Sequence, residues 1–437
     1  MRNRFLSASF LTIFFSAAMY AQAPPQQIAL KAARLIDGKS STVLTNAVIL
    51  IEANKIKSVG SNLAIPAGAK VIDLGDSTLL PGLIDSHTHL LEEMDGANLT
   101  LQDAEMLRIV ATQSTAERAL LGAKLAKEDL EAGITTVRDL GNSGVNGDVA
   151  LSRAIDRGWL PGPRMIVSTR ALAAQGGQFG PLTPEAQPII EREYVTLHGA
   201  ESARQAVRQA LYDGARCIKV IVNGSPASVT LDELKAIVDE AHTYKVKVAA
   251  HAIGDHATRI AAEAGVDSIE HAYVVPDDVL KMMVAKHIYL VPTDGTVKTF
   301  VDMSIGTRQA TAEERANLEN QFRGHVQRNQ DRLRRAIKAG VPIAAGSDMY
   351  LSMPHMTRGQ ASLLLYEAYS EAGMTPIQII QAATSNAADL LGLAEALGAL
   401  EPGKQADIIA VPGDPTQSPS ALQHAIFVMK SGAIIKN

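Results

Sequence analysis

Eight short apolar runs, separated by longer segments with helical spacing, constrain the fold of this chain more than any other feature of its sequence. The runs cover residues 83–89, 135–140, 165–170, 217–222, 246–251, 268–271, 288–292 and 342–348. Amphipathic stretches at 104–131, 200–213, 231–244 and 312–339 lie between several of them. Regular alternation of strands and helices is typical of an α/β protein with parallel strands, and eight such units indicate a (β/α)₈ TIM barrel. An open, doubly wound sheet is the alternative, but no glycine-rich phosphate turn follows the first run.

The two ends of the chain differ from the middle in the spacing of their apolar residues. Residues 27–80 form brief apolar runs interrupted by glycine, proline and asparagine, and residues 407–435 repeat this pattern. Such spacing predicts short β-strands. We therefore expect a small β-sandwich domain built from residues 24–80 and 396–437, flanking a barrel domain of residues 81–395. The segment 295–311 is the most irregular and is predicted to be a loop at the barrel mouth.

The first 23 residues resemble a targeting segment. Arg2 and Arg4 precede the apolar segment 5–19, and small residues follow at 21–23. This is the pattern of a secretory signal peptide, and its apolar core is short for a membrane-spanning helix. An uncleaved N-terminal anchor is the alternative. We expect an exported protein, periplasmic or secreted, with no membrane span after the signal is removed.

Composition excludes several classes of function. The 437 residues contain 41 Lys and Arg against 46 Asp and Glu, a net charge of −5, so no basic excess is present to bind nucleic acid. Cys217 is the single cysteine beside 11 histidines, so a metal site would use nitrogen and oxygen ligands. Neither Gly-x-Ser-x-Gly nor His-Glu-x-x-His occurs, which gives no support to serine-hydrolase or zincin chemistry.

Candidate metal ligands stand at the ends of the apolar runs. His87 and His89 are two residues apart in the first run, so their side chains project from the same face of a strand. His251, His271 and Asp348 each end a later run. A single histidine at such a position is more often a hydrogen-bonded core residue. Because all strands of a barrel end on one face, however, these five side chains are expected to converge there and bind a divalent metal.

Lys219 is unusual because it lies within the apolar run 217–222. A buried ammonium is costly unless it is paired or chemically modified. On composition and spacing alone, a lysine that extends to the barrel rim is the favoured interpretation.

Several motifs together resemble those of the metal-dependent amidohydrolase superfamily. They lie at 80–89, 133–139, 218–220, 251–252, 269–272, 346–348 and 398–408, so the resemblance covers nearly all of the chain after the signal. The chain is most similar to the branch of Xaa-Pro dipeptidase-like and ochratoxinase-like enzymes, which is related to imidazolonepropionase.

The resemblance implies a binuclear metal centre with zinc as the usual ion. His87 and His89 would bind the more buried metal, and His251 and His271 the second. Lys219 would be carboxylated by CO₂ and bridge both ions. The position that Asp348 occupies would contact the first metal and shuttle a proton from a metal-bridging hydroxide to the leaving amine.

Members of this branch cleave the amide bonds of dipeptides and N-acyl amino acids, and some cleave ochratoxin A. The resemblance therefore implies a carboxypeptidase-like or dipeptidase-like hydrolase acting on a small molecule. Gln178 stands where many relatives have the histidine of Gly-Gly-His-Gly, so an altered substrate contact is expected there. Tyr273 is a second candidate contact. Arg170, His355 and Arg358 are more typical of structural residues at the rim.

Two other functions stay open. A hydrolase of cyclic amides or imidazolones from the same superfamily would use one metal and no bridging lysine. A non-catalytic exported binding protein would lack at least one ligand, yet all six ligand positions are occupied. The sequence leaves the oligomeric state open, with a homo-oligomer as one alternative.

Overall fold

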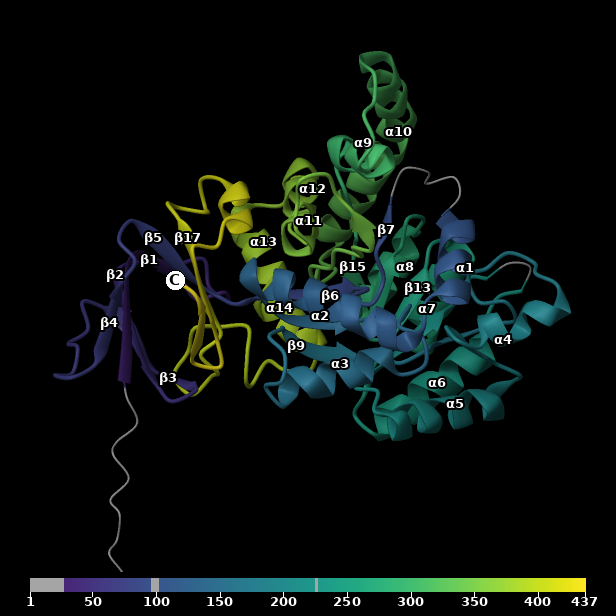
Figure 1. The fold of residues 1–437 in the computed structure, drawn as a ribbon, viewed down its shortest axis with the longest axis horizontal. Coiled ribbons are helices and arrows are strands. Elements are labelled where there is room, and N and C mark those ends of the chain that lie inside the picture. Colours follow the sequence, from purple (N-terminus) through teal and green to yellow (C-terminus); the bar gives the residue numbers. More distant parts are fainter. Residues whose placement is uncertain (1–26, 96–101, 225–226) are drawn as a thin grey trace, which may run out of the picture.

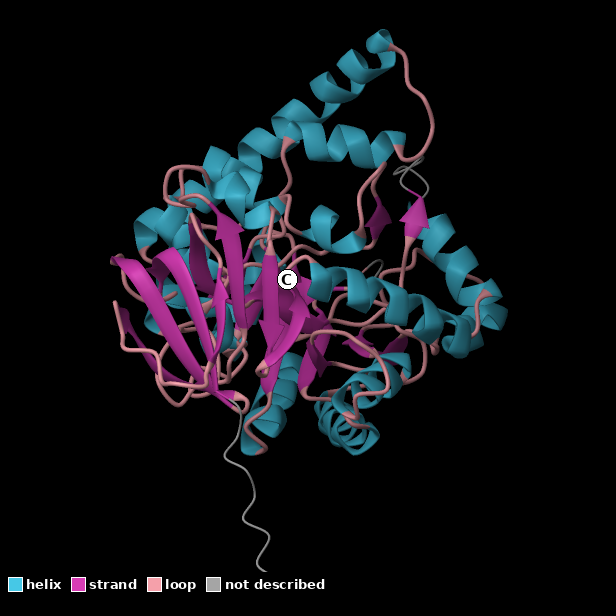
Figure 2. Ribbon diagram, turned by 60° about the vertical axis from the view of Figure 1, so that its left-hand side comes forward, coloured by secondary structure: helices cyan, strands magenta, loops and turns pink. Residues whose placement is uncertain are grey.

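The computed structural model describes residues 27–95, 102–224 and 227–437. The predicted signal peptide, residues 1–23, lies outside this part of the chain. Figure 1 shows two parts side by side: a sheet formed by both chain ends, and a larger region of strands surrounded by helices. Figure 2 shows the same division by element type, with the sheet of long strands at one end.

Strands from the two ends of the chain form one eight-stranded sheet. Its members are β1 (Gln27–Ile36), β2 (Val43–Glu52), β3 (Lys55–Ser61), β4 (Lys70–Asp73), β5 (Ser77–Pro81), β17 (Ile408–Pro412), β18 (Phe427–Lys430) and β19 (Ala433–Lys436). The two ends meet where β5 pairs antiparallel with β17. Leu30, Ile49, Ile408 and Phe427 are buried in a separate apolar core of this sheet. Strands from residues 27–81 and from the C-terminal segment therefore share one sheet.

The strands of the larger region pair in parallel in two sheets. One contains β6 (Leu83–Thr88), β8 (Ile134–Asp139) and β9 (Arg164–Val167), and the other contains β11 (Tyr194–Thr196), β10 (Ala171–Ala173), β12 (Cys217–Ile221), β13 (Lys247–Ala252), β14 (Ser268–His271) and β15 (Tyr289–Val291). Seven of the eight predicted runs therefore contain strands of the expected parallel kind. The short strands β10 and β11 follow β9 and were not predicted.

The eighth run, 342–348, is not a continuous strand. It makes one bridge with β15, between Leu290 and Ile343, and the residue after it, Met349, makes another with Thr88 of β6. Between these bridges, a Cβ on Gly346 would stand 2.4 Å from Val291 Cγ1 and 2.8 Å from the Cβ of His87, so only glycine allows this close approach.

Helices cover the outside of the parallel strands (Figures 1 and 2). The longer ones are α1 (Gln102–Thr112), α2 (Thr115–Glu131), α3 (Gly147–Asp156), α5 (Ala200–Asp213), α6 (Leu231–Thr243), α7 (Asp255–Ala264), α8 (Asp277–Ala285), α9 (Val297–Ile305) and α10 (Ala312–Ala339). Shorter elements are α4 (Gln187–Ile190), α11 (Arg358–Ser362), α12 (Leu365–Glu371), α13 (Pro376–Ala382), α14 (Ser385–Leu390) and the pair β7 (Met94–Asp95) and β16 (Leu351–Ser352).

Two sequence expectations about helices were wrong. The predicted helix 104–131 is divided into α1 and α2, because Ser114 caps α2 in a reciprocal capping box with Glu117. The segment 295–311, predicted to be a loop, contains α9. Thr296 starts this helix by accepting a hydrogen bond from the backbone N–H of Thr299. Helices α9 and α10 project together beyond the strands (Figure 1).

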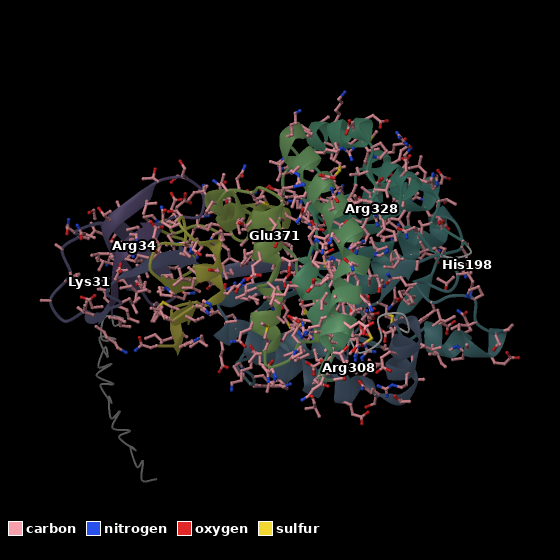
Figure 3. All side chains as sticks on the ribbon, turned by 90° about the horizontal axis from the view of Figure 1, so that it is seen from above. Lys31, Arg34, His198, Arg308, Arg328 and Glu371 are labelled. Carbon is pink, nitrogen blue, oxygen red and sulfur yellow. The ribbon has the colours of Figure 1, made fainter. Side chains whose placement is uncertain are left out.

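Charged side chains cover the exterior of both parts. Lys31 and Arg34 lie on the sheet at one end of the molecule, and His198 lies at the opposite end (Figure 3). Within the described ranges, no helix combines the length and the apolar character needed to cross a membrane.

Candidate metal centre

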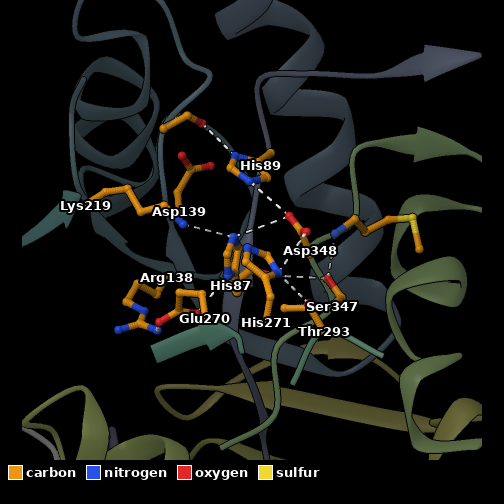
Figure 4. Close-up of polar contacts among 12 residues, drawn as sticks. His87, His89, Arg138, Asp139, Lys219, Glu270, His271, Thr293, Ser347 and Asp348 are labelled. Carbon is orange, nitrogen blue, oxygen red and sulfur yellow. Dashed lines mark hydrogen bonds and ion pairs between the residues drawn. The ribbon is translucent and has the colours of Figure 1, made fainter. Parts of the chain in front are cut away.

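The predicted metal ligands come together in one cavity of about 240 Å³. Its lining includes His87, His89, Lys219, His251, His271 and Asp348. They come from β6, the residue after β6, β12, β13, β14 and the last position of the eighth run, respectively. Figure 4 shows several of them pointing toward one another. The register of the parallel strands brings the side chains of β12, β13 and β14 together, because Ile221 of β12 pairs with His251, and Ala252 pairs with His271.

Three of these residues form a group suited to a metal ion. Asp348 Oδ1 lies 3.4 Å from His87 Nε2 and 3.2 Å from His89 Nε2. One ligand atom from each residue fits within 4.8 Å of the others. Two imidazole nitrogens and a carboxylate oxygen at such spacing are a donor set that divalent cations such as zinc accept.

Hydrogen bonds behind the two histidines fix which ring nitrogen faces the cavity. His87 Nδ1 donates to Glu270 Oε2 at 2.8 Å, and His89 Nδ1 donates to the Gly141 carbonyl at 2.9 Å. Each ring therefore presents Nε2 toward Asp348. Glu270 is held in turn by Arg138, whose Nη2 donates at 2.9 Å to the other carboxylate oxygen. Hydrogen-bond partners on the far side of the ring orient metal-binding histidines in proteins in this way.

His251 and His271 lie beside this group. Their ring centroids are 4.6 Å apart, and the ring of His271 is 5.1 Å from that of His87. His271 Nδ1 lies 2.7 Å from Thr293 Oγ1. The backbone of His271 has φ +67°, a left-handed conformation that costs free energy for a residue with a side chain. Asp348 shares this feature, with φ +51°.

Lys219 is buried, so the interpretation favoured on composition and spacing alone, a lysine that extends to the barrel rim, is wrong. Its Nζ lies 3.5 Å from His87 Nε2, so it points into the cavity and does not extend to the rim. Burial lowers the pKa of its ammonium to about 8, against the pull of the nearby carboxylates of Glu270 and Asp348. The neutral amine is therefore a minor but much larger fraction near pH 7 than it is for an ordinary lysine.

The same desolvation acts on the imidazoles. Burial, reinforced by the charge of Lys219, lowers the pKa of His251 to about 3 and holds the pKa of His87 well below its ordinary value. Burial also depresses the pKa of His271. These rings are neutral, which leaves a nitrogen lone pair on each for a metal ion. Burial opposes ionisation of Asp348, but His87 and His89 outweigh it and lower the pKa of this carboxyl group.

Several supporting residues were not singled out from the sequence. Asp85 accepts hydrogen bonds from the backbone N–H groups of His87 and Ser347, which ties the first strand to the segment carrying Asp348. Arg138 and Glu270 form a buried ion pair behind His87. Arg138 lies in the motif at 133–139 and Glu270 in the motif at 269–272, so these two motifs could have indicated a role for them. Arg358, expected at the rim, is buried, and its guanidinium donates to the carbonyls of His89, Glu92 and Met349.

The two predicted substrate contacts line the same cavity. Gln178 is exposed, and its Oε1 accepts a hydrogen bond from the Tyr194 hydroxyl at 3.3 Å. The ring of Tyr273 lies 5.6 Å from that of His271. Tyr273 also lines a neighbouring cavity of about 410 Å³, which shares Asp348 and Tyr350 with the first.

Comparison with known proteins identifies the family of this chain. The model of the amidohydrolase family matches residues 78–437, and the chain belongs to that family. The ochratoxinase of Aspergillus niger is 30% identical over 431 residues, which cover 90% of this chain and 83% of the relative. The imidazolonepropionase of Deinococcus radiodurans is 26% identical over 394 residues, covering 85% and 86%. Among solved structures, a Xaa-Pro dipeptidase with methionine bound in its active site superposes with a TM-score of 0.78. It is 29% identical and covers 94% of this chain and 100% of its own.

The family and these relatives identify the broad class. Amidohydrolases of this kind are hydrolases that act on carbon–nitrogen bonds of small molecules, and their structural neighbours have a TIM-barrel type of fold. The described part of this chain is α/β with parallel strands, and it contains a His-His-Asp group able to hold a divalent ion.

Proposed function

We propose that this protein is a binuclear metal-dependent hydrolase that cleaves the amide bond of dipeptides or N-acyl amino acids. The observation that carries this proposal is the meeting of four neutral or partnered imidazoles, one lysine and one carboxylate in a single cavity. The similarity to ochratoxinase and to a Xaa-Pro dipeptidase supports the choice of amide substrates, and makes ochratoxin A a substrate worth testing.

The six side chains divide into two groups of ligands. His87, His89 and Asp348 would hold the first cation, since their donor atoms are already close together. His251 and His271 would hold the second. Lys219 would supply oxygen ligands to both after its neutral amine adds to CO₂. The chemistry of the donor set fits zinc, which takes nitrogen and carboxylate oxygen ligands.

When bound, the cations would supply positive charge that lowers the pKa of a water molecule and polarises the scissile carbonyl. The remaining work falls to side chains. Asp348, ionised because its pKa is lowered, accepts the proton that the attacking water loses and delivers it to the leaving nitrogen. The C–N bond breaks, and the products are a carboxylic acid and an amine. Tyr273 and Gln178, at the cavity wall, would orient the substrate.

The proposal extends to the architecture. The bridges of Ile343 to β15 and of Met349 to β6 support closure of the two parallel sheets into a (β/α)₈ barrel, with residues 81–395 as its domain. The separate apolar core of the eight-stranded sheet supports a β-sandwich of residues 24–80 and 396–437. The N-terminal pattern supports export by a signal peptide at 1–23, to the periplasm or the medium.

The experiment is a screen of purified, metal-loaded protein against dipeptides, N-acyl amino acids and ochratoxin A, together with metal analysis. We expect two metal ions per chain, hydrolysis of at least one amide substrate, and loss of turnover with a chelator. In parallel, Lys219→Ala should lose metal and activity. Two metals with full turnover in this variant would contradict the bridging role of Lys219.

A second function is favoured by the similarity to imidazolonepropionase. A hydrolase of cyclic amides with one metal would not require Lys219. One metal per chain, no bound CO₂ and turnover of a cyclic amide alone would therefore replace our proposal with this one.

A further inference from the structure

A second cavity, of about 410 Å³, opens beside the candidate metal centre. Its walls come from α9, α10, α11 and α12. Tyr273, Asp348 and Tyr350 line both cavities, so the two spaces adjoin at the proposed site of chemistry. A volume of this size is within the ordinary range for a small-molecule site. The proposed metal chemistry does not use this space.

Aromatic rings form one wall of the second cavity. Phe300 of α9 stacks on Phe322 of α10, with ring centroids 5.5 Å apart and an interplanar angle of 22°. His325 meets Phe300 edge-on at 5.4 Å and Tyr273 at 5.4 Å. This series of rings leads from the helical hairpin directly to His271. Met303, Leu364 and Leu365 add further apolar surface.

The charge of the cavity restricts what can enter it. No lysine or arginine is among its described lining residues, and its two acidic residues are Asp294 and Asp348. Arg332 neutralises Asp294 from the buried side, with Nη2 at 2.5 Å from Oδ1. His325 accepts a hydrogen bond at Nε2 from the Asn329 amide, as a neutral imidazole does. An anionic group would therefore lose its hydration here without gaining a cationic partner.

We propose that the second cavity binds an uncharged aromatic or branched apolar group of the amide substrate and so determines substrate preference. The preferred substrates are then amides with a bulky apolar group next to the scissile bond, and any free carboxylate lies outside this cavity. The inference rests on the proposed amide hydrolase function, which it makes more specific.

Two substrate series test the proposal by hydrolysis. In the first, the acyl group of N-acyl-alanine varies from acetyl to 3-phenylpropionyl. In the second, the amine side of N-acetyl amino acids varies from alanine to phenylalanine. We expect the aromatic member of one series to exceed its small member in kcat/KM by at least tenfold, because each apolar group fitted into a pocket contributes roughly 10- to 200-fold.

The variants Phe300→Ala and Phe322→Ala should remove most of this preference while the small substrates keep their kcat/KM. Both side chains are partly exposed, and Phe322→Leu keeps the helix packed if the alanine variants fold poorly. Tyr212→Ala, which removes an aromatic ring that is 86% exposed on α5, is the matched control. Equal losses for large and small substrates, or no preference in either series, would overturn the proposal.

A binding measurement separates this inference from the proposed function. Calorimetry with 3-phenylpropanamide and with propanamide should give a dissociation constant at least tenfold lower for the aromatic amide. A para-carboxylate on the ring should weaken binding tenfold or more, and Phe322→Leu should reduce the difference between the two amides. Such binding without hydrolysis of any amide would refute the proposed function alone. Hydrolysis without aromatic preference in binding would refute this inference alone.

Discussion

The two neighbouring cavities differ in how their shapes are determined. In the cavity of about 240 Å³, side chains at the ends of parallel strands are fixed by directed contacts such as the hydrogen bond from His87 to Glu270. In the cavity of about 410 Å³, the walls are helices whose side chains meet by packing, as Phe300 and Phe322 do. Hydrogen bonds specify direction and distance, whereas apolar packing specifies little beyond volume.

The difference has a consequence for substitutions. A proposed metal ligand or proton carrier in the first cavity, or a residue that orients one, should affect every substrate, since its contacts support the reacting atoms. An apolar residue of the second cavity should affect only substrates that enter it. The cavity of about 240 Å³ is called the polar cavity from here on. Four changes to it are expected to have effects of decreasing size.

The largest effect is expected for Asp348→Asn. The amide keeps the shape of the carboxyl group but cannot accept and return a proton, so kcat should fall about 10²- to 10⁴-fold for all substrates alike. Steady-state kinetics with metal content measured on the same sample tests this. Asp331→Asn, at an exposed carboxylate of α10, is the control. A loss limited to large substrates would place Asp348 in substrate fitting and not in proton transfer.

Glu270→Gln should weaken metal binding roughly 10- to 100-fold, the usual effect of removing a partner behind a metal-binding histidine. The glutamine loses the negative charge that His87 Nδ1 and Arg138 now share. Competition with a metal-buffering chelator measures the change, and thermal unfolding of the metal-free protein reports any general destabilisation. Glu371→Gln, on the exposed side of α12, is the control. Unchanged affinity would show that packing alone orients His87.

The pKa of Lys219 predicts how fast metal-free protein recovers when CO₂ and metal are added. Only the neutral amine adds to CO₂, and burial lowers the ammonium pKa to about 8. At constant dissolved CO₂, the initial rate should therefore rise about tenfold from pH 7 to pH 9 and then level off. A lysine with an ordinary pKa would instead give a rise of about 100-fold that continues above pH 9. Lys219→Ala should show no CO₂-dependent recovery.

The smallest effect is expected for Gln178→His. This exposed side chain lies at the wall of the polar cavity and binds Tyr194, away from the proposed ligands. We expect a change of a few fold in relative kcat/KM among C-terminal residues, because an imidazole can carry charge that a glutamine cannot, with metal content unchanged. Gln175→His, three residues earlier and also exposed, is the control. Identical preferences in both variants would remove Gln178 from the set of substrate contacts.

The parallel strands and the meeting of the proposed ligands could be predicted because their signals are local. His87 and His89 alternate along one strand, and His251 and His271 end their own runs, so strand direction alone brings them to one face. The break between α1 and α2 could have been predicted from the capping pair Ser114 and Glu117. Helix α9 was missed because its nine residues follow an irregular segment and its first turn has no acidic residue.

By itself, the sequence predicted seven of the parallel strands, the positions of the proposed ligands and a β-structured segment at each chain end, because periodicity and residue type are properties of short segments. Only the tertiary structure decided the rest. It turned Lys219 into the cavity, where burial lowers its pKa, and placed Glu270 and Arg138 behind His87. It also placed the rings of α9 and α10 beside the candidate metal centre. Burial, directed contacts and the shape of a cavity depend on residues far apart in the chain, so no local pattern could specify them.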